Sequence, residues 1–265
     1  MDRHVRAGGA AVRVLVTGGT GRLGRVLVPE LRRRGHETVI LSRSPREGEP
    51  DRLVGDLFTG VGVREALEGA EAVVHAASHV GGHDDIVAAD NLLSSIREVG
   101  ARLVHVSIVG IDHHPYPYYR VKRAVEYRVE RSDAPAAILR ATQFHDFVEE
   151  LLRKSTAGPV ALVPAETSAQ PVSVEAVASR LADLVESDAI GRQPDLAGPL
   201  VQTAEDLMRE SLAARRSRAQ VLRVRIPGRA GAAFRRGDHL AGPDAVLAGE
   251  TFAQFVGRQR PGGRE

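Results

Sequence analysis

The chain lacks cysteine and tryptophan, and aromatic residues make up 4% of its 265 positions. The absence of cysteine excludes disulfide frameworks, cysteine-based zinc sites, iron–sulfur clusters and cysteine nucleophiles. No apolar run reaches the roughly 18 residues that a membrane helix needs. The first ten residues carry no apolar segment of the kind found in secretory signals. We therefore expect a cytoplasmic protein without a membrane-bound role.

Lysine is also scarce, because Lys122 and Lys154 are the two lysines among 36 basic residues. The 34 acidic residues leave a net charge of +2. Arginine clusters at 32–34 and 215–218 are interpreted as solvated helix faces, so we expect no nucleic-acid partner. In such an arginine-rich chain, a lysine at a meaningful spacing is informative.

The composition is that of a globular protein, with 43% hydrophobic and 26% charged residues. Short valine-rich runs bounded by glycine alternate with segments of helical periodicity. This alternation predicts βαβ units and a parallel sheet covered on both faces. The predicted strands are 12–17, 37–42, 52–54, 72–76, 102–108 and 136–139. The predicted helices are 23–34, 63–67, 86–99, 118–131 and 174–185.

We predict an α/β fold: a Rossmann-type, doubly wound parallel sheet with a small C-terminal substrate lobe. Residues 1–10 are interpreted as a flexible leader and 11–142 as the dinucleotide-binding core. Residues 143–265 would form the smaller lobe, with a partial return to the core. Within it, 143–170 and 190–240 are rich in proline and glycine and are expected to be irregular.

A glycine-rich loop follows the first predicted strand and precedes the first helix. It reads Thr-Gly-Gly-Thr-Gly-Arg-Leu-Gly over 17–24. Glycines at this spacing allow a tight turn and a close approach of backbone to a pyrophosphate, which the helix N-terminus then attracts. The alternative is a tight turn without a ligand. The expected cofactor contacts in the loop are Gly18, Thr20, Gly21, Arg22, Leu23 and Gly24.

The end of the second predicted strand bears on the choice of cofactor. NAD-binding folds place an acidic residue there for the ribose hydroxyls. Here the segment is Leu-Ser-Arg-Ser over 41–44, without an acid. Arg43 can pair with a 2′-phosphate through a bidentate fork, and Arg22 could assist. We therefore predict NADP, with NADPH preferred over NADH, while a solvent-facing Arg43 is the alternative.

Three residues further along suit the reduction of a carbonyl. Ser107 lies near the end of the fifth predicted strand, and Tyr118 and Lys122 are separated by one helical turn. A tyrosine phenol can donate a proton to the developing alkoxide, and a nearby ammonium favours the phenolate. The serine hydroxyl can orient the substrate oxygen. Alternatively, Tyr118 packs in the core and Lys122 is solvated, since the rigid segment 113–117 could aim the tyrosine elsewhere.

The remaining candidates are weaker. His75, His79 and His83 recur every four residues, but glycines interrupt the helical spacing, so we expect no metal site. His79 could instead line the substrate cleft. Phe144 and Phe147 follow the sixth strand and could form a substrate wall or pack in the core. Glu149 and Glu150 are interpreted as a solvated helix face.

These motifs resemble the short-chain dehydrogenase/reductase superfamily, and within it the atypical NmrA-like, NAD(P)H-binding branch. The resemblance covers about residues 11–147 and follows the family's order. Its matching segments are 17–24, 55–57 (Gly-Asp-Leu), 75–78 (His-Ala-Ala-Ser), 104–110 (Val-His-Val-Ser-Ile-Val-Gly), 118–122 and 138–144 (Ile-Leu-Arg-Ala-Thr-Gln-Phe). The extra asparagine of many short-chain reductases has no clear match, and Asn91 is expected in a structural helix.

The resemblance implies several further contacts. Asp56, with Leu57 beside it, would contact the adenine, and Ala76 and Ala77 would line the nucleotide cleft. Near the nicotinamide and the substrate would lie Arg140, Thr142 and Gln143. Many NmrA-like members lack the tyrosine and act as redox sensors or binders, so Ser107, Tyr118 and Lys122 favour catalysis here.

The sequence thus predicts an NADP-dependent oxidoreductase. It would transfer a hydride between NADPH and a carbonyl or conjugated double bond of a small organic molecule. The chain is expected to be a monomer or a homodimer. Two alternatives stay open: an NADP(H)-sensing binder without turnover, and a redox-neutral epimerase, dehydratase or cyclase. A methyltransferase ranks last because it leaves Tyr118 and Lys122 unexplained.

Overall fold

The computed structural model describes residues 11–44, 51–78 and 84–259, so the predicted leader at 1–10 lies outside it. The chain forms two compact units, each assembled from segments that are separate in the sequence. The first comprises Met1–Val106, Val125–Ile138 and Ala178–Arg192, and the second Ser107–Ala124, Leu139–Val177 and Gln193–Glu265. Both units therefore draw on residues from either side of the predicted boundary at 142.

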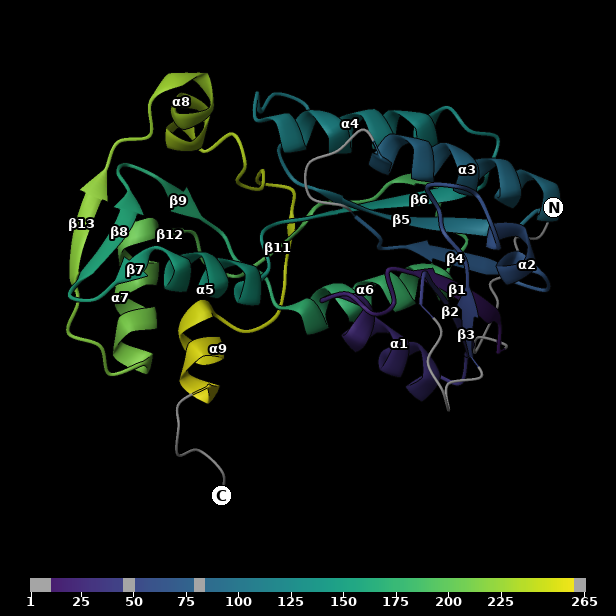
Figure 1. Cartoon of the computed structure of the whole chain (residues 1–265), viewed down its shortest axis with the longest axis horizontal. Coiled ribbons are helices and arrows are strands. Elements are labelled where there is room, and N and C mark those ends of the chain that lie inside the picture. Colours follow the sequence, from purple (N-terminus) through teal and green to yellow (C-terminus); the bar gives the residue numbers. More distant parts are fainter. Residues whose placement is uncertain (1–10, 45–50, 79–83, 260–265) are drawn as a thin grey trace. The chain divides into compact units, whose positions relative to one another are not determined.

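The first unit is built on a parallel sheet with the strand order β3-β2-β1-β4-β5-β6 (Figure 1). The order reverses between β1 and β4, which is the Rossmann arrangement, and the predicted fold class is confirmed. The strands are β1 (Arg13–Thr17), β2 (Glu37–Ser42), β3 (Arg52–Val54), β4 (Ala72–His75), β5 (Arg102–Ile108) and β6 (Ala136–Ala141).

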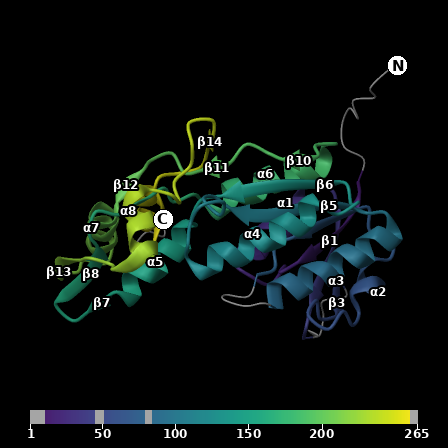
Figure 2. The same ribbon diagram turned by 90° about the horizontal axis from the view of Figure 1, so that it is seen from above.

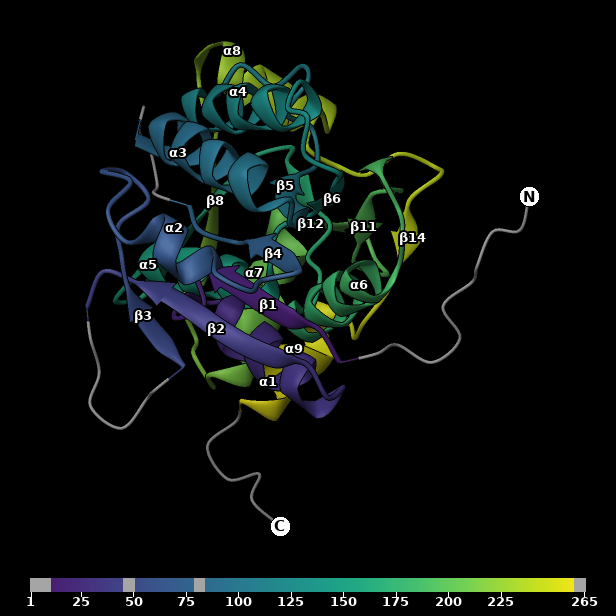
Figure 3. The same cartoon turned by 90° about the vertical axis from the view of Figure 1, so that its right-hand side faces the viewer.

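Helices cover both faces of this sheet (Figures 1 and 3). They are α1 (Gly24–Arg33), α2 (Val63–Leu67), α3 (Asp84–Val99) and parts of α4 (Pro117–Glu130) and α6 (Val174–Glu186). On one face, Leu67 and Ile96 pack into a buried cluster with Leu15 of β1. On the other face, α1 and α6 are joined by Arg34, which pairs with Asp183 at 2.7 Å. Because both faces are covered, the strands are continuously apolar rather than alternating.

The second unit contains short strands and four complete helices. A three-stranded sheet has the order β13-β8-β7, and a two-stranded sheet pairs β12 with β9 (Figures 1 and 2). Its strands are β7 (Thr156–Ala157), β8 (Val160–Pro164), β9 (Ser168–Ala169), β11 (Leu196–Ala197), β12 (Gln202–Thr203), β13 (Gln220–Val224) and β14 (Val246–Leu247), while β10 (Gly191–Arg192) pairs with β6 in the first unit. Its complete helices are α5 (His145–Lys154), α7 (Ala204–Ala214), α8 (Gly228–Arg236) and α9 (Phe252–Arg258).

A separate hydrophobic core holds the second unit together. Leu152 of α5, Met208 of α7 and Phe252 of α9 pack with Ala161 and Val163 of β8. These two strand residues point inward, whereas Leu162 between them is exposed, as the period of two in a strand requires. The helices α5, α7 and α9 therefore cover one face of the small sheet.

The predicted elements of the core agree with the structure to within two residues at each end. The prediction of irregular chain at 143–170 and 190–240 is wrong, because α5, α7 and α8 occupy much of it. Among the residues that the structure describes, no helix combines the length and apolar character needed to cross a membrane.

Candidate active site

The glycine loop lies in the first unit between the end of β1 and the start of α1. Gly18 has a φ of 72°, and a Cβ added there would lie 2.6 Å from the backbone nitrogen of Ala77. A Cβ on Gly24 would lie 2.3 Å from the carbonyl oxygen of Gly18. Atoms cannot approach so closely, so both positions require glycine. The loop thereby packs directly against the backbone of Ala76 and Ala77.

The surroundings of the loop suit a pyrophosphate. Thr20, Gly21 and Arg22 are exposed at its tip, and the first turn of α1 contains no acidic residue. The positive end of the helix dipole is therefore not neutralised by a side chain. Arg25 braces the tip by donating from Nε to the carbonyl oxygen of Thr20 at 2.9 Å. The loop fits a dinucleotide phosphate in shape and in charge.

Two further strand ends of the first unit carry predicted cofactor contacts. Arg43 is exposed one residue after β2. Asp56 follows β3, and its Oδ1 accepts a hydrogen bond from the backbone of Phe58 at 2.8 Å. Asn91 donates to the carbonyl oxygen of Leu57 at 2.9 Å, so α3 fixes this loop. The prediction that Asn91 is structural is confirmed.

The end of β4 holds a histidine pair. His75 is hydrogen-bonded through Nδ1 to Thr17 Oγ1 at 2.7 Å and stacks on His105 with a centroid distance of 5.3 Å. His79 and His83 lie outside the described residues, so the predicted place of His79 in the substrate cleft is not tested. The contacts of His75 join β1 to β4 beside the glycine loop.

Ser107 and Thr142, in the second unit, carry buried hydroxyls. Ser107 on β5 is 0% exposed, and Thr142 directly follows β6. Neither Ser107 Oγ nor Thr142 Oγ1 has a hydrogen-bond partner among the described residues. A buried hydroxyl without a partner is costly, so both oxygens are suited to bind a polar group of a ligand.

Tyr118 and Lys122 lie one turn apart on α4, in the part of this helix that belongs to the second unit. Tyr118 is partly buried, and Lys122 is 4% exposed. Lysine is almost never buried to this degree without a specific role or partner. The alternative of a solvated Lys122 is therefore wrong.

The neighbouring Tyr119 is in a different environment. Burial raises its pKa to about 12, against a hydrogen bond with the side chain of Gln143 that lowers it. Its ring stacks on His114 at a centroid distance of 4.3 Å. Tyr119 is 8% exposed and serves as a packing residue, whereas Tyr118 on the same helix is partly buried.

The residues that the resemblance places near the substrate are tied to neighbours within the second unit. Arg140 is buried and forms a fork with both carboxylate oxygens of Asp112. Gln143 donates to the carbonyl oxygen of His239 at 3.3 Å. Phe144 is half-buried, whereas Phe147 on α5 is 49% exposed. The ring of Phe147 is thus open to a ligand, and Arg140 is held rigidly.

Sequence reasoning missed two buried histidines in the second unit. Burial lowers the pKa values of His114 and His239, whose rings lie 6.2 Å apart. His114 accepts a hydrogen bond at Nδ1 from the backbone of Tyr116, and His239 bonds through Nε2 to the carbonyl oxygen of Ser168. The pattern His-His-Pro at 113–115 was a local signal for one of them, but nothing local pointed to their pairing.

Two interpretations of charged residues as solvated are wrong. Glu149 is 4% exposed and accepts from Arg153 Nε at 2.6 Å, whereas Glu150 pairs with Lys154 at the surface. Arg34, with a side chain 16% exposed, reaches from α1 to α6. Glu149 also lies 3.8 Å from Arg215, and Arg34 pairs with Asp183, so each contacts a residue far away in the sequence.

The chain matches the NAD(P)H-binding family over residues 18–188. The chain belongs to this family, which lies in the atypical branch of the short-chain dehydrogenase/reductases, and the resemblance stated above is confirmed. The glycine loop is included in the match, and NAD(P)H is the nucleotide that its geometry fits.

Curated relatives match over part of their length. An uncharacterized protein of Mycobacterium tuberculosis is 35% identical over 103 residues, 36% of this chain and 12% of that protein. The 2-alkyl-3-oxoalkanoate reductase of Stenotrophomonas maltophilia is 30% identical over 120 residues, 39% of this chain and 36% of that enzyme. Phenylcoumaran benzylic ether reductase of Populus trichocarpa is 27% identical over 34% of this chain and 33% of its own. The chain thus spans well under two thirds of these relatives.

Solved structures resemble nearly the whole chain. Triphenylmethane reductase of Citrobacter sp., complexed with NADP(H), has a TM-score of 0.77 at 17% identity and covers 94% of this chain and 100% of its own. UDP-N-acetylglucosamine 4-epimerase of Bacillus cereus has a TM-score of 0.71 at 18% identity and covers 94% and 95%. At these identities the likeness shows the fold and leaves the reaction open.

Proposed function

We propose that the protein is an NADPH-dependent reductase of small organic molecules that carry a carbonyl or a conjugated double bond. The observation that supports this most strongly is the set of Ser107, Tyr118 and Lys122. One of two lysines in the chain is buried one turn from a partly exposed tyrosine, and Ser107 Oγ has no hydrogen-bond partner within the described part of the chain. Relatives named as reductases are consistent with this chemistry.

Each of the three side chains has one role in the proposed reaction. When bound, NADPH supplies a hydride to the substrate carbon. The phenol of Tyr118 donates its proton to the substrate oxygen, and solvent later restores that proton. The ammonium of Lys122 stabilises the phenolate that remains. Ser107 donates a hydrogen bond to the same substrate oxygen and fixes its position.

The preference for NADPH is assigned to Arg43. A guanidinium after β2 can pair with a 2′-phosphate through two parallel hydrogen bonds, and a ribose hydroxyl offers no such partner. The segment 41–44 has no carboxylate that would repel the phosphate. Arg22 would contribute a second positive charge. Substrate contacts are proposed for Phe147, which is exposed, and for His79, Gln143 and Phe144.

The proposed reaction is tested by replacing each of two tyrosines of α4 with phenylalanine in separate variants. Tyr118→Phe removes one hydroxyl, and we expect kcat with a reducible carbonyl substrate to fall roughly 100-fold or more. The dissociation constant of NADPH should be nearly unchanged. Tyr127→Phe is the matched control, since Tyr127 lies on α4 with its side chain 50% exposed, and should keep full activity.

The measured quantity is the rate at which the enzyme consumes NADPH in the presence of each compound in a panel of aldehydes, ketones and enones. Full turnover by Tyr118→Phe would refute the proton-donor role. Tight binding without consumption of NADPH on any compound, together with capture of a protein partner that depends on the redox state of the cofactor, would replace the reductase by a sensor.

A further inference from the structure

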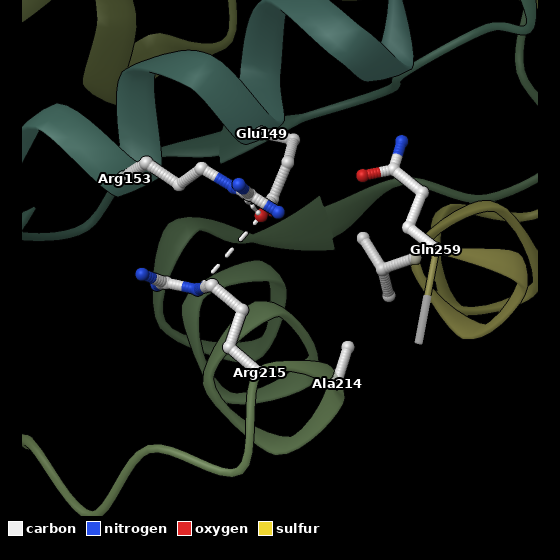
Figure 4. Close-up of a pocket in the computed structure, with 6 residues that line it drawn as sticks. Glu149, Arg153, Ala214, Arg215 and Gln259 are labelled. Carbon is white, nitrogen blue, oxygen red and sulfur yellow. Dashed lines mark hydrogen bonds and ion pairs between the residues drawn. The ribbon is translucent and has the colours of Figure 1, made fainter. Parts of the chain in front are cut away.

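A pocket lies in the second unit, where the ends of α7 and α9 meet α5 (Figure 4). Its volume is about 310 Å³, at the lower end of the range for small-molecule sites. It is lined by Glu149, Arg153, Ala214, Arg215, Val256 and Gln259. None of these residues belongs to the site proposed above.

Glu149 lies at the centre of the pocket, and one of its two carboxylate oxygens has a hydrogen-bond partner among the described residues. The side chain of Glu149 is 6% exposed, and its Oε1 accepts from Arg153 Nε at 2.6 Å and lies 3.8 Å from Arg215 Nε. Its Oε2 has no hydrogen-bond partner among the described residues. Figure 4 shows Glu149 between the two guanidinium groups. A structural ion pair that joins α5 to α7 accounts for Oε1 and leaves Oε2 unexplained.

An unpartnered carboxylate oxygen requires a donor, because burying it without one is costly. A carboxylate paired with arginine only accepts hydrogen bonds, so the missing partner must carry an O–H or N–H group. This requirement points to a ligand with a donor.

The two arginines add a second requirement. Arg153 and Arg215 give the pocket two positive charges against the one negative charge of Glu149. Their side chains are 51% and 23% exposed, so guanidinium N–H groups remain within reach of solvent and of a ligand. Arg215 is also held by donating to the carbonyl oxygen of Ser211 at 3.3 Å. Guanidinium groups that are fixed in this way select planar or tetrahedral oxyanions.

We propose that this pocket binds a small phosphate-type anion that keeps a proton or hydroxyl to donate to Glu149 Oε2. Inorganic phosphate and small phosphate monoesters with hydroxyl groups share this chemistry. The volume exceeds that of a bare anion, and Ala214 and Val256 provide apolar walls for a carbon skeleton. Sulfate has the same shape but no proton to donate at neutral pH, so the carboxylate rejects it.

The test compares anions on the full chain by calorimetry, with phosphate, sulfate and glycerol 3-phosphate as probes. We expect the wild type to bind phosphate at least about tenfold more tightly than sulfate. Glu149→Gln should abolish this discrimination, because an amide can donate to sulfate. Arg215→Gln should weaken the binding of phosphate about tenfold. If Arg215→Gln does not fold, Arg153→Gln takes its place. Arg218→Gln, which removes the same charge at an exposed position, should bind as the wild type does.

The arms give separate outcomes. Tighter binding of glycerol 3-phosphate than of inorganic phosphate identifies a phosphate ester as the occupant, and the reverse order identifies the free anion. Phosphate bound to the glycine loop would survive Arg215→Gln, which separates the two sites. Equal affinity for phosphate and sulfate, no phosphate binding, or equal weakening by Arg215→Gln and Arg218→Gln would overturn the proposal.

Discussion

Gly24 begins α1, and its α-carbon packs against the backbone of Gly18 and Gly19. A methyl group there would meet the carbonyl oxygen of Gly18 at 2.3 Å and the Cα of Gly19 at 2.4 Å. Both neighbours are backbone atoms, so the loop itself must shift to make room. The same shift would displace the loop N–H groups to which we assign the pyrophosphate.

Gly24→Ala is therefore expected to cost about 1–3 kcal/mol of unfolding free energy and to weaken NADPH binding. Gly257→Ala is the control, because that position on α9 has a negative φ and no atom within 4 Å of an added Cβ. It should stabilise the protein by up to about 1 kcal/mol. Urea unfolding and nucleotide titration measure both effects. A Gly24→Ala protein as stable as the wild type would show that the loop tolerates a side chain.

Single residues also show which features of the candidate sites can be predicted from the sequence and which cannot. Ser107 and Lys122 were chosen by spacing and residue type, and burial then agreed with a role in a site. Glu149 was interpreted as solvated because charged residues usually are. Its burial depends on Arg215, which comes from a helix far along the chain. Local patterns contain no information about such a partner.

At the scale of elements, one ion-pair network joins α1 to α6. Arg34 donates to Glu30 within α1 and to Asp183 and Glu186 on α6. Hydrogen bonds from Arg33 and then Arg34 lower the pKa of Glu30 to about 2. The carboxylate of Glu30 thus holds the arginine in the orientation that reaches α6.

The sign of the pH dependence follows from this lowered pKa. A carboxylate with a depressed folded pKa stabilises the protein above its unfolded pKa of about 4.5, and the contribution is lost as the pH falls towards about 2. Since the network is partly solvated, Glu30→Gln should cost only about 0.5–1 kcal/mol at neutral pH. The deficit should shrink below about pH 4.5.

Glu68→Gln is the matched control on an exposed position of the same unit, and it should leave stability unchanged at every pH. Urea midpoints measured from neutral to acid pH compare the three proteins. A Glu30→Gln deficit that grows as the pH falls would contradict the network.

The elements of the Rossmann sheet were predicted well because their strands are short, largely buried apolar runs. Strand β5 over Arg102–Ile108 was predicted to the residue, because its leucine, two valines and isoleucine mark a largely buried strand. The elements β8 and β13 were missed, and β13 is mostly exposed, so it lacks the buried apolar run of the core strands. Helix α7 carries apolar residues that are buried only because α9 and β8 cover them. Tertiary packing decides such elements, and periodicity alone does not.

At the scale of the whole molecule, the family match ends at residue 188. It includes the glycine loop, Ser107, Tyr118 and Lys122, and leaves out β11 to α9. The predicted substrate lobe is therefore the part with least support from relatives. The family match therefore supports NAD(P)H as the cofactor, whereas the class of substrate is a proposal.

The central claim is that the chain binds NADPH in preference to NADH, and a fluorescence titration of the bound nicotinamide tests it most directly. We predict that NADPH binds at least about tenfold more tightly than NADH, because Arg43 forms a charge-assisted fork with the 2′-phosphate. Arg43→Ala should remove the preference, and Arg97→Ala, which removes an exposed charge from α3, should keep it. Equal or tighter binding of NADH, or no binding of either nucleotide, would contradict the account.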